Sequence, residues 1–101
     1  MAVTVTDVPD LSRYEARVDG AVAGFAAYQR KGNLVVFTHT EVDARHEGQG
    51  VAGTIAREVL DDVRRRGLRA LLRCPFLARW VTRHPEYDDV LVHHIEKNTG
   101  P

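Results

Sequence analysis

The fold of this chain is decided by the stretch Ala44-Arg45-His46-Glu47-Gly48-Gln49-Gly50-Val51-Ala52-Gly53, which separates an apolar run from a long amphipathic run. A strand, a glycine loop and a helix in this order form an arrangement that holds phosphate. The N–H groups of a first helical turn have no partner within the helix, and the helix dipole adds partial positive charge there. Glycine lets the backbone approach a ligand without an intervening Cβ. The stretch therefore predicts a loop that binds a pyrophosphate.

Composition limits the classes of protein that the chain can represent. Its 101 residues are 44% hydrophobic, which suits a single domain spanning 1–101. The 14 basic and 14 acidic side chains cancel, so neither nucleic acid nor an acidic membrane is an expected partner. One cysteine excludes an internal disulfide and fits a reducing compartment. With neither a signal-peptide pattern in Met1 to Asp10 nor an apolar run near the roughly 20 residues of a membrane span, we expect a cytoplasmic protein.

Three strands are expected before the glycine loop. Apolar and charged residues alternate from Ser12 to Val18, and Asp19-Gly20 is a strong signal for a two-residue hairpin turn. The run from Ala21 to Gln29 is small and apolar, and Leu34 to Val42 follows the next turn. Strict alternation would place Leu34, Val36, Thr38, Thr40 and Val42 on one face of this third strand, with Val35, Phe37, His39 and Glu41 on the other. Short turns predict an antiparallel meander.

After the loop, apolar residues spaced by three and four predict a helix from Val51 to Arg66, capped by Gly67. Leu68 to Cys74 reads as a fourth strand, parallel to the third because a helix connects them. Pro75 is suited to begin a second helix, which His84-Pro85 would end. A further short strand is considered for Val90 to Ile95. The expected fold class is α+β, with a mixed sheet, a strand–helix–strand crossover and a second C-terminal helix.

Several blocks of this sequence resemble those of one family. Arg45 to Gly50 matches the Gln/Arg-x-x-Gly-x-Gly/Ala signature of the GNAT superfamily of N-acetyltransferases. The blocks His39-Thr40-Glu41-Val42 and Cys74-Pro75-Phe76 are similar to hallmarks of its small, YjdJ-type GNAT-like branch, and Trp80-Val81 and His84-Pro85-Glu86-Tyr87 follow. The resemblance covers roughly residues 12 to 92. One departure is Glu47, because many members carry arginine before the first glycine of the signature.

The resemblance implies acetyl-coenzyme A as the cofactor, and so a small-molecule acyl donor and an amine acceptor. In such folds the third and fourth strands part, and the pantetheine arm fills the gap. The implied contacts with the arm are backbone groups of Thr40, Glu41 and Val42. The residues implied at the pyrophosphate are Gly48, Gln49, Gly50, Val51, Ala52, Gly53 and Thr54, with Arg45 belonging to the same signature.

Transfer of an acetyl group to an amine needs a neutral nucleophile, stabilisation of an oxyanion and a proton for the departing thiolate. Cys74 is a candidate catalytic residue because it stands ahead of a helix N-terminus, whose dipole favours a thiolate. It could accept the acetyl group or act as an acid. The alternative is that Cys74 is a small buried residue on the face of Leu68, Ala70 and Leu72.

His39 and Glu41 are the other candidate catalytic residues, since either could take a proton directly or through water. The alternative is a structural hydrogen bond for His39 and a surface ion pair for Glu41. Arg79 and Arg83, four residues apart on the second helix, could reach a 3′-phosphate, although a solvated helix face is the favoured explanation. Trp80 and Phe76 suit the core better than an adenine platform. No metal site is expected, because the histidines and Cys74 show no ligand spacing.

The sequence thus predicts an acetyl-coenzyme A-dependent N-acetyltransferase of minimal size. Two alternatives remain open: a non-catalytic module that binds or senses acyl-coenzyme A, and a protein-interaction domain in which the glycine loop is only a turn. The acceptor could be a protein or peptide amine or a small polyamine, and the sequence does not specify an oligomeric state.

Overall fold

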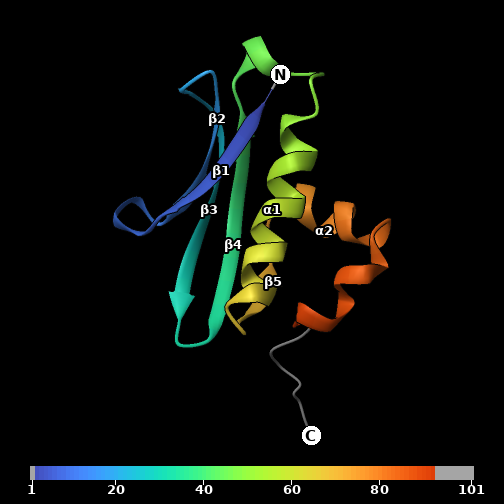
Figure 1. Ribbon diagram of the computed structural model, residues 1–101. Coiled ribbons are helices and arrows are strands. Elements are labelled where there is room, and N and C mark those ends of the chain that lie inside the picture. The colour runs from blue at the N-terminus through green and yellow to red at the C-terminus, as the bar shows by residue number, and fades with distance from the viewer. Residues whose placement is uncertain (1, 93–101) are drawn as a thin grey trace, which may run out of the picture.

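One twisted sheet with two helices on one face makes up the chain in the computed structural model, which describes residues 2–92 (Figure 1). The strands are β1 (Val3–Val8), β2 (Arg13–Val18), β3 (Ala21–Lys31), β4 (Leu34–Val42) and β5 (Arg69–Leu72). The α-helices are α1 (Val51–Arg65) and α2 (Pro75–Thr82), and short 3-10 turns occupy Pro9–Leu11, Ala44–His46 and Pro85–Val90. The strand order is β1-β2-β3-β4-β5, antiparallel except for the parallel pair β4–β5. The predicted α+β class is confirmed.

The turn between β2 and β3 has the predicted chemistry. Asp19 and Gly20 both have positive φ, at 52° and 83°. A two-residue type I′ turn needs that conformation at both positions, and its twist matches that of the strands. The meander therefore follows from local turn residues.

Strand β1 was not predicted from the sequence. Val3 to Val8 pairs antiparallel with β2, with Val3 opposite Val18 and Val8 opposite Arg13. Val3 and Val5 pack against the core, whereas Thr4 and Thr6 are exposed. The alternation of valine and threonine is the usual pattern of an edge strand with one buried face, so the antiparallel part of the sheet has four strands.

Helix α1 covers the sheet with the predicted apolar stripe. Its buried residues are Val51, Ile55, Ala56, Val59, Leu60 and Val63. Gly67 has φ 70°, and the N–H of Leu68 donates to the carbonyl of Val63 while that of Gly67 donates to Arg64. This pair of bonds is the Schellman motif, which ends a helix at a left-handed glycine. The predicted helix is thus confirmed to within one residue of its predicted end.

A β-bulge in β4 makes one sequence prediction wrong. Ala27 pairs with His39 and Tyr28 with Phe37, so Thr38 is an extra residue on β4. An extra residue reverses the faces that follow it. Val35 and Phe37 lie in the core beside α1, but beyond Thr38 it is Thr40 and Val42 that face this side. The side chains of His39 and Glu41 are 57% and 64% exposed on the opposite face. Strict alternation along β4 therefore fails at Thr38.

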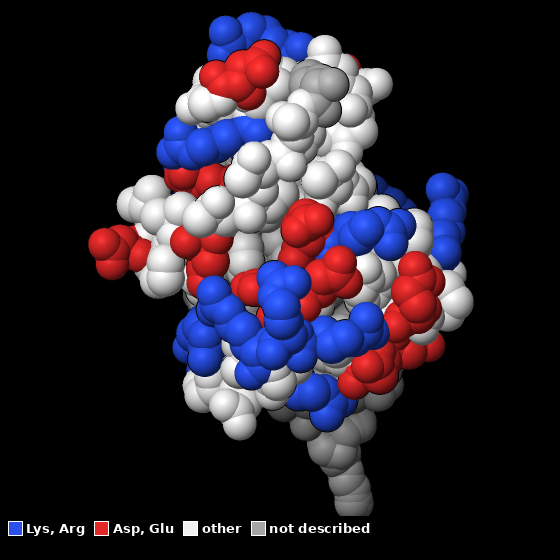
Figure 2. Space-filling view, viewed as in Figure 1, with Lys and Arg blue, Asp and Glu red and all other residues white. Residues whose placement is uncertain are grey.

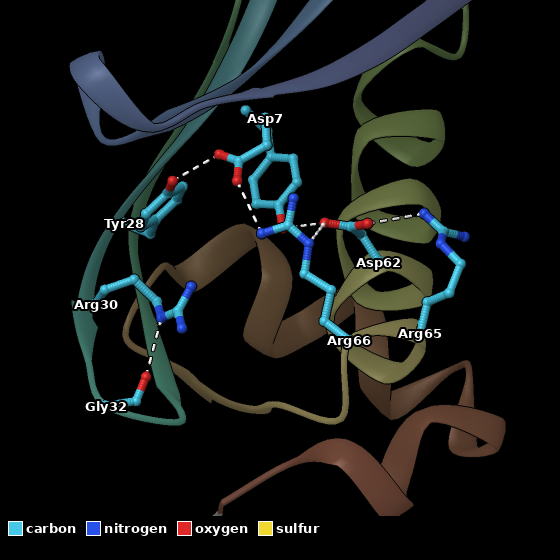
Figure 3. Close-up of polar contacts among 8 residues, drawn as sticks. Asp7, Tyr28, Arg30, Gly32, Asp62, Arg65 and Arg66 are labelled. Atoms are coloured by element: carbon cyan, nitrogen blue, oxygen red, sulfur yellow. Dashed lines mark hydrogen bonds and ion pairs between the residues drawn. The ribbon is translucent and has the colours of Figure 1, made fainter.

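A polar network fastens β1 to the end of α1 (Figure 3). Arg66 contacts Asp7 of β1 at 3.1 Å and Asp62 of α1 at 3.0 Å. The hydroxyl of Tyr28 donates to Asp7 at 2.6 Å, and that of Tyr14 donates to Asp62 at 2.7 Å. Each carboxylate is therefore shared by a guanidinium and a phenol, which satisfies polar groups at the edge of the core.

The chain after α2 returns to the free edge of β5. Leu91 forms a parallel bridge with Ala70, and the N–H of Val92 donates to the carbonyl of Ala70 at 2.8 Å. Val90 belongs to a 3-10 turn, so the strand considered from Val90 to Ile95 does not begin there. The rest of that predicted strand, residues 93–95, lies outside the described residues.

Candidate active site

The glycine loop has the geometry of an anion site. Gly48 and Gly50 have φ of 80° and 81°, which other residues rarely adopt. Within the described part of the chain, the N–H groups of Val51, Ala52 and Gly53 form no well-aligned hydrogen bond, and Gly50 supplies no side-chain cap. Three donors and the positive end of the α1 dipole are therefore free at the start of this helix.

A cavity of about 260 Å³ lies against these donors. Its lining residues are Val42, His46, Glu47, Gly48, Gly50, Val51, Ala52 and Gly53. The Nδ1 atom of His46 is buried and has no hydrogen-bond partner within residues 2–92. A Cβ built on Gly48 or Gly50 would meet no atom within 4 Å, so open space adjoins the backbone at both glycines. The cavity thus offers free N–H donors and room for a phosphate group, as a pyrophosphate would need, and His46 with its buried, unpaired Nδ1 belongs to its lining.

His46 is a residue that sequence reasoning did not single out. It falls inside the signature, two residues before its first glycine, and that position was the only available signal. The single carboxylate in the cavity lining is that of Glu47, whose charge opposes a phosphate.

Basic side chains gather away from this loop. On the face shown in Figure 2, Lys and Arg cluster over the end of the molecule where α1 finishes, interspersed with Asp and Glu. Arg65 and Arg66 belong to this end and are paired with Asp62. The glycine loop lies at the other end of α1 (Figure 1). Attraction of an anion to the loop therefore depends on the backbone rather than on this cluster.

Strands β4 and β5 part after four paired residues, as the resemblance implied. The pairing runs from Leu34 opposite Arg69 to Phe37 opposite Leu72. The carbonyl of Phe37 then accepts from both Arg73 and Cys74, at 2.9 and 3.0 Å, and α2 begins at Pro75. β4 continues to Val42, so its edge beyond Phe37 has no neighbouring strand on this side in the part of the chain that the structure describes.

Cys74 and Thr40 lie on the two sides of this gap. The Sγ of Cys74 donates to Oγ1 of Thr40 at 3.2 Å. Cys74 is 2% exposed and belongs to the core cluster that also holds Leu68, Ala70 and Leu77. The thiol is thus packed in the core and also lies at the gap. Both roles considered for Cys74, catalysis and packing, therefore remain predictions.

His39 and Glu41 form a pair on the outer face of the sheet, with Nε2 to Oε2 at 3.1 Å. The ring of Phe25 lies 5.9 Å from that of His39, and Arg13 lies over Phe25 at 4.7 Å. Arg13 in turn holds the buried carboxylate of Glu15, and this hydrogen bond lowers the pKa of Glu15. The pair lies on the side of β4 opposite to Cys74.

Other predicted cofactor residues lie outside the cavity. Arg45 is exposed and binds Asp43 at 3.1 Å, and this hydrogen bond lowers the pKa of Asp43 to about 2. Gln49 is exposed next to the cavity, and the hydroxyl of Thr54 donates to the carbonyl of Gly50 at 3.0 Å. Arg79 is exposed on α2. The structure thus brings the glycines and Val42 together and leaves Arg45 and Arg79 away from them.

Helix α2 presents an aromatic stack toward α1. The rings of Trp80 and His84 are parallel at 3.6 Å, and Arg57 of α1 lies 5.4 Å from the Trp80 ring. Phe76, Trp80 and Val81 pack partly buried against the core. The indole nitrogen lies 4.0 Å from the position that a Cβ on Gly53 would take. Trp80 therefore packs against the first turn of α1, as a core residue does.

Comparison with known proteins agrees with this geometry. The family model described as GCN5-related N-acetyl-transferase matches residues 13–90. No curated protein sequence matches the chain. Within residues 2–92, no helix has the length and apolar character needed to cross a membrane.

Solved structures share the fold. A GCN5-like protein from Staphylococcus aureus is similar over 97% of this chain and 96% of its own, with a TM-score of 0.68 at 17% identity. The ribosomal-protein-alanine N-acetyltransferase of Brucella melitensis matches over 88% of this chain and 68% of its own, with a TM-score of 0.53 at 20% identity. The ribosomal-protein-S18-alanine N-acetyltransferase of Escherichia coli matches over 56% of this chain and 37% of its own, with a TM-score of 0.53 at 21% identity.

These likenesses show the fold, and the family model spans more than half of the chain and includes both the glycine loop and Cys74. The chain belongs to the GCN5-related N-acetyltransferases, a family of acyltransferase enzymes.

Proposed function

We propose that this chain, acting as a single domain, transfers an acetyl group from acetyl-coenzyme A to an amine. The observation that carries the proposal is the gap in which β4 continues beyond β5, with the Cys74 thiol bonded across it to Thr40. An unpaired strand edge can bind an extended arm through backbone hydrogen bonds, as added strands do. The edge from Thr40 to Val42 leads from this gap to the glycine cavity, which Val42 also lines.

The cofactor would be held at two places. The free N–H groups of Val51, Ala52 and Gly53 would bind the pyrophosphate, with His46 Nδ1 beside them. Backbone groups of Thr40 to Val42 would bind the arm. Bound acetyl-coenzyme A would supply the acetyl group as a thioester.

The chain's own groups divide the proton transfers between the two sides of β4. His39, oriented by Glu41, would take the proton from the acceptor amine on the outer face of the sheet. Cys74 holds a proton at Sγ, directed at Thr40, and would give it to the departing thiolate. Holding the two reactants on either side of the same gap would supply much of the rate.

The test is to incubate the protein with acetyl-coenzyme A and a panel of amines, and to detect acetylated amine by mass spectrometry. Coenzyme A alone should raise the melting temperature, because it binds only the folded state. If the wild type acetylates an amine and a His39→Gln, Glu41→Gln double variant does not, the result would support the roles given to this pair. The alternatives give different results: binding without transfer to any amine indicates an acyl-coenzyme A sensing module, and no thermal shift indicates an interaction domain.

A further inference from the structure

A second groove reaches the same gap from the outer face of the sheet. It has a volume of about 270 Å³ and is lined by Gln29, Lys31, Leu34, Val36, Thr38, Leu71 and Arg73. Val36 and Leu71 are buried, with 6% and 8% exposure, yet neither belongs to the core cluster beneath α1. The groove therefore lies across the sheet from that core, and its floor is apolar.

One end of this groove lies at the point where β4 and β5 part. Thr38 is the bulged residue. The N–H of Arg73 donates to the carbonyl of Phe37, which is the last residue of β4 that pairs with β5. The other end is formed by Lys31 and Leu34, which pair with each other where β3 turns into β4. Thr38 is four residue steps along the strand from Leu34, or about 13 Å at 3.3 Å per residue.

The charges along this groove have one sign. Lys31 and Arg73 are its charged residues, and no acidic residue lines it. Within residues 2–92 neither side chain forms an ion pair. This contrasts with Arg45, Arg64, Arg65 and Arg66, each of which is paired with an aspartate. A ligand with an anionic group would therefore find charge partners here that the protein itself does not supply.

The opposite charge lies beyond the bulge on the same face. The carboxylate of Glu41 contacts His39 and no lysine or arginine within the described residues. An amine directed at the gap would thus have His39 and Glu41 on one side and the cations of the groove on the other.

On the basis of the function proposed above, we propose that this groove binds the acceptor, and that the acceptor is a small amine with an apolar chain and a carboxylate. The amine lies at the gap beside Thr38, the chain lies over Val36 and Leu71, and the carboxylate pairs with Lys31 or Arg73. A polyamine has no group for these cations and is repelled by them.

Three probes of equal chain length test the charge of the acceptor: 6-aminohexanoate, hexylamine and 1,6-diaminohexane. With saturating acetyl-coenzyme A, we expect kcat/KM for 6-aminohexanoate to exceed that of the other two by about tenfold, the value of one charge-assisted contact. The preference should disappear in a Lys31→Gln, Arg73→Gln double variant. Equal rates for the three probes, or a preference that survives the double variant, would overturn the inference.

Arg30→Gln is a control for the Lys31 substitution, because it removes one positive charge from the residue before Lys31. Arg30 lies on the other side of the strand, near Tyr28 and Asp7 (Figure 3). The preference for 6-aminohexanoate should persist in this variant. The thermal shift produced by coenzyme A should be the same in the wild type, the double variant and Arg30→Gln, because the glycine cavity shares no residue with the groove.

A binding measurement separates this inference from the proposed function. If coenzyme A binds but no probe is acetylated, methyl NMR of Leu34, Val36 and Leu71 decides the matter. Shifts caused by 6-aminohexanoate and not by hexylamine, and lost in the double variant, would uphold the groove as a site for anionic amines while the transfer reaction fails. No shift with any of the three probes would overturn the inference as well.

Discussion

The Cys74 thiol donates a hydrogen bond to the Thr40 hydroxyl across the gap between β4 and β5, at 3.2 Å. This contact fixes the direction of Sγ in a place where the two strands no longer bond through their backbones. It joins the only cysteine of the chain to a residue of the His39-Thr40-Glu41-Val42 block. The contact therefore connects two of the sequence blocks that point to the family.

Replacing Cys74 by alanine should reduce acetyl transfer by at least tenfold while coenzyme A still binds. Loss of the proton at Sγ would slow departure of the thiolate, an effect of the size usual for general acids. Removing the buried sulfur should also cost about 1 kcal/mol of stability, which urea unfolding measures. Thr40→Val is the control, because it removes the partner and leaves the thiol. Turnover unchanged in Cys74→Ala would identify the cysteine as packing.

Gly50→Ala should weaken coenzyme A binding, whereas Gly20→Ala should not. Both glycines have positive φ, at 81° and 83°, and neither Cβ would meet an atom of the protein. Each substitution should therefore destabilise the protein by about 1–2 kcal/mol through backbone strain. Only at Gly50 would the new Cβ point into the space proposed for the pyrophosphate. Calorimetric titration with coenzyme A compares the two variants, and equal affinities would contradict a pyrophosphate at this loop.

Glu47→Arg should strengthen coenzyme A binding. Glu47 lines the glycine cavity, and its carboxylate would repel a phosphate. Reversal of the charge should increase the affinity by about tenfold at low salt and by less at high salt, because exposed charges are screened. Glu47→Gln should give a smaller gain. Affinity that does not change with either substitution would place the phosphates elsewhere.

The stability of the protein should fall in alkaline solution, in part because of two of its buried tyrosines, Tyr14 and Tyr28. Burial, followed by the hydrogen bond to Asp7, raises the pKa of Tyr28 to about 12, and burial with the bond to Asp62 raises the pKa of Tyr14 further. In the unfolded chain both phenols lose their protons near pH 10. Their contribution to stability is thus complete below pH 10 and is lost as the pH rises toward the folded pKa values.

Between pH 8 and pH 11, each tyrosine should account for about 1 kcal/mol of the lost stability. Urea unfolding at the two pH values measures the loss in the wild type and in Tyr14→Phe and Tyr28→Phe. Each variant should be less stable at pH 8, since it leaves an aspartate with one partner fewer. Its further loss up to pH 11 should be smaller than that of the wild type. A loss of equal size in all three proteins would show that the phenols are not responsible.

Local signals in the sequence were enough for much of the fold. Pro75 began α2, because the first position of a helix needs no N–H donor and suits the fixed φ of proline. Asp19-Gly20 specified a hairpin and Gly67 ended α1, because these positions need a positive φ, which few residues adopt. The glycine loop was predicted for the same reason. Its free N–H groups follow from the geometry of any helix start.

The features that were not predicted depend on contacts between distant residues. Thr38 differs little from its neighbours in strand preference, and it becomes a bulge only through the pairing of β4 with β3. The burial of Glu15 depends on Arg13 and Arg17 lying on either side of it. The burial of His46 Nδ1 without a hydrogen-bond partner is likewise a feature of the folded chain that its local sequence does not indicate. The outer groove depends on the pairing of β4 with β3 and β5, which places Gln29 and Leu71 on either side of Val36.

The bulge at Thr38 gives the end of β4 two chemically different faces. If Thr38 continued the regular alternation instead of forming the bulge, Thr40 and Val42 would point to solvent, and His39 and Glu41 would point under α1. With the bulge, the end of β4 presents hydroxyl and apolar groups to the helix side and ionisable groups to the outside. Deleting Thr38 should therefore leave both surfaces in place, because Phe37 and His39 already face consecutive residues of β3 and would then alternate regularly.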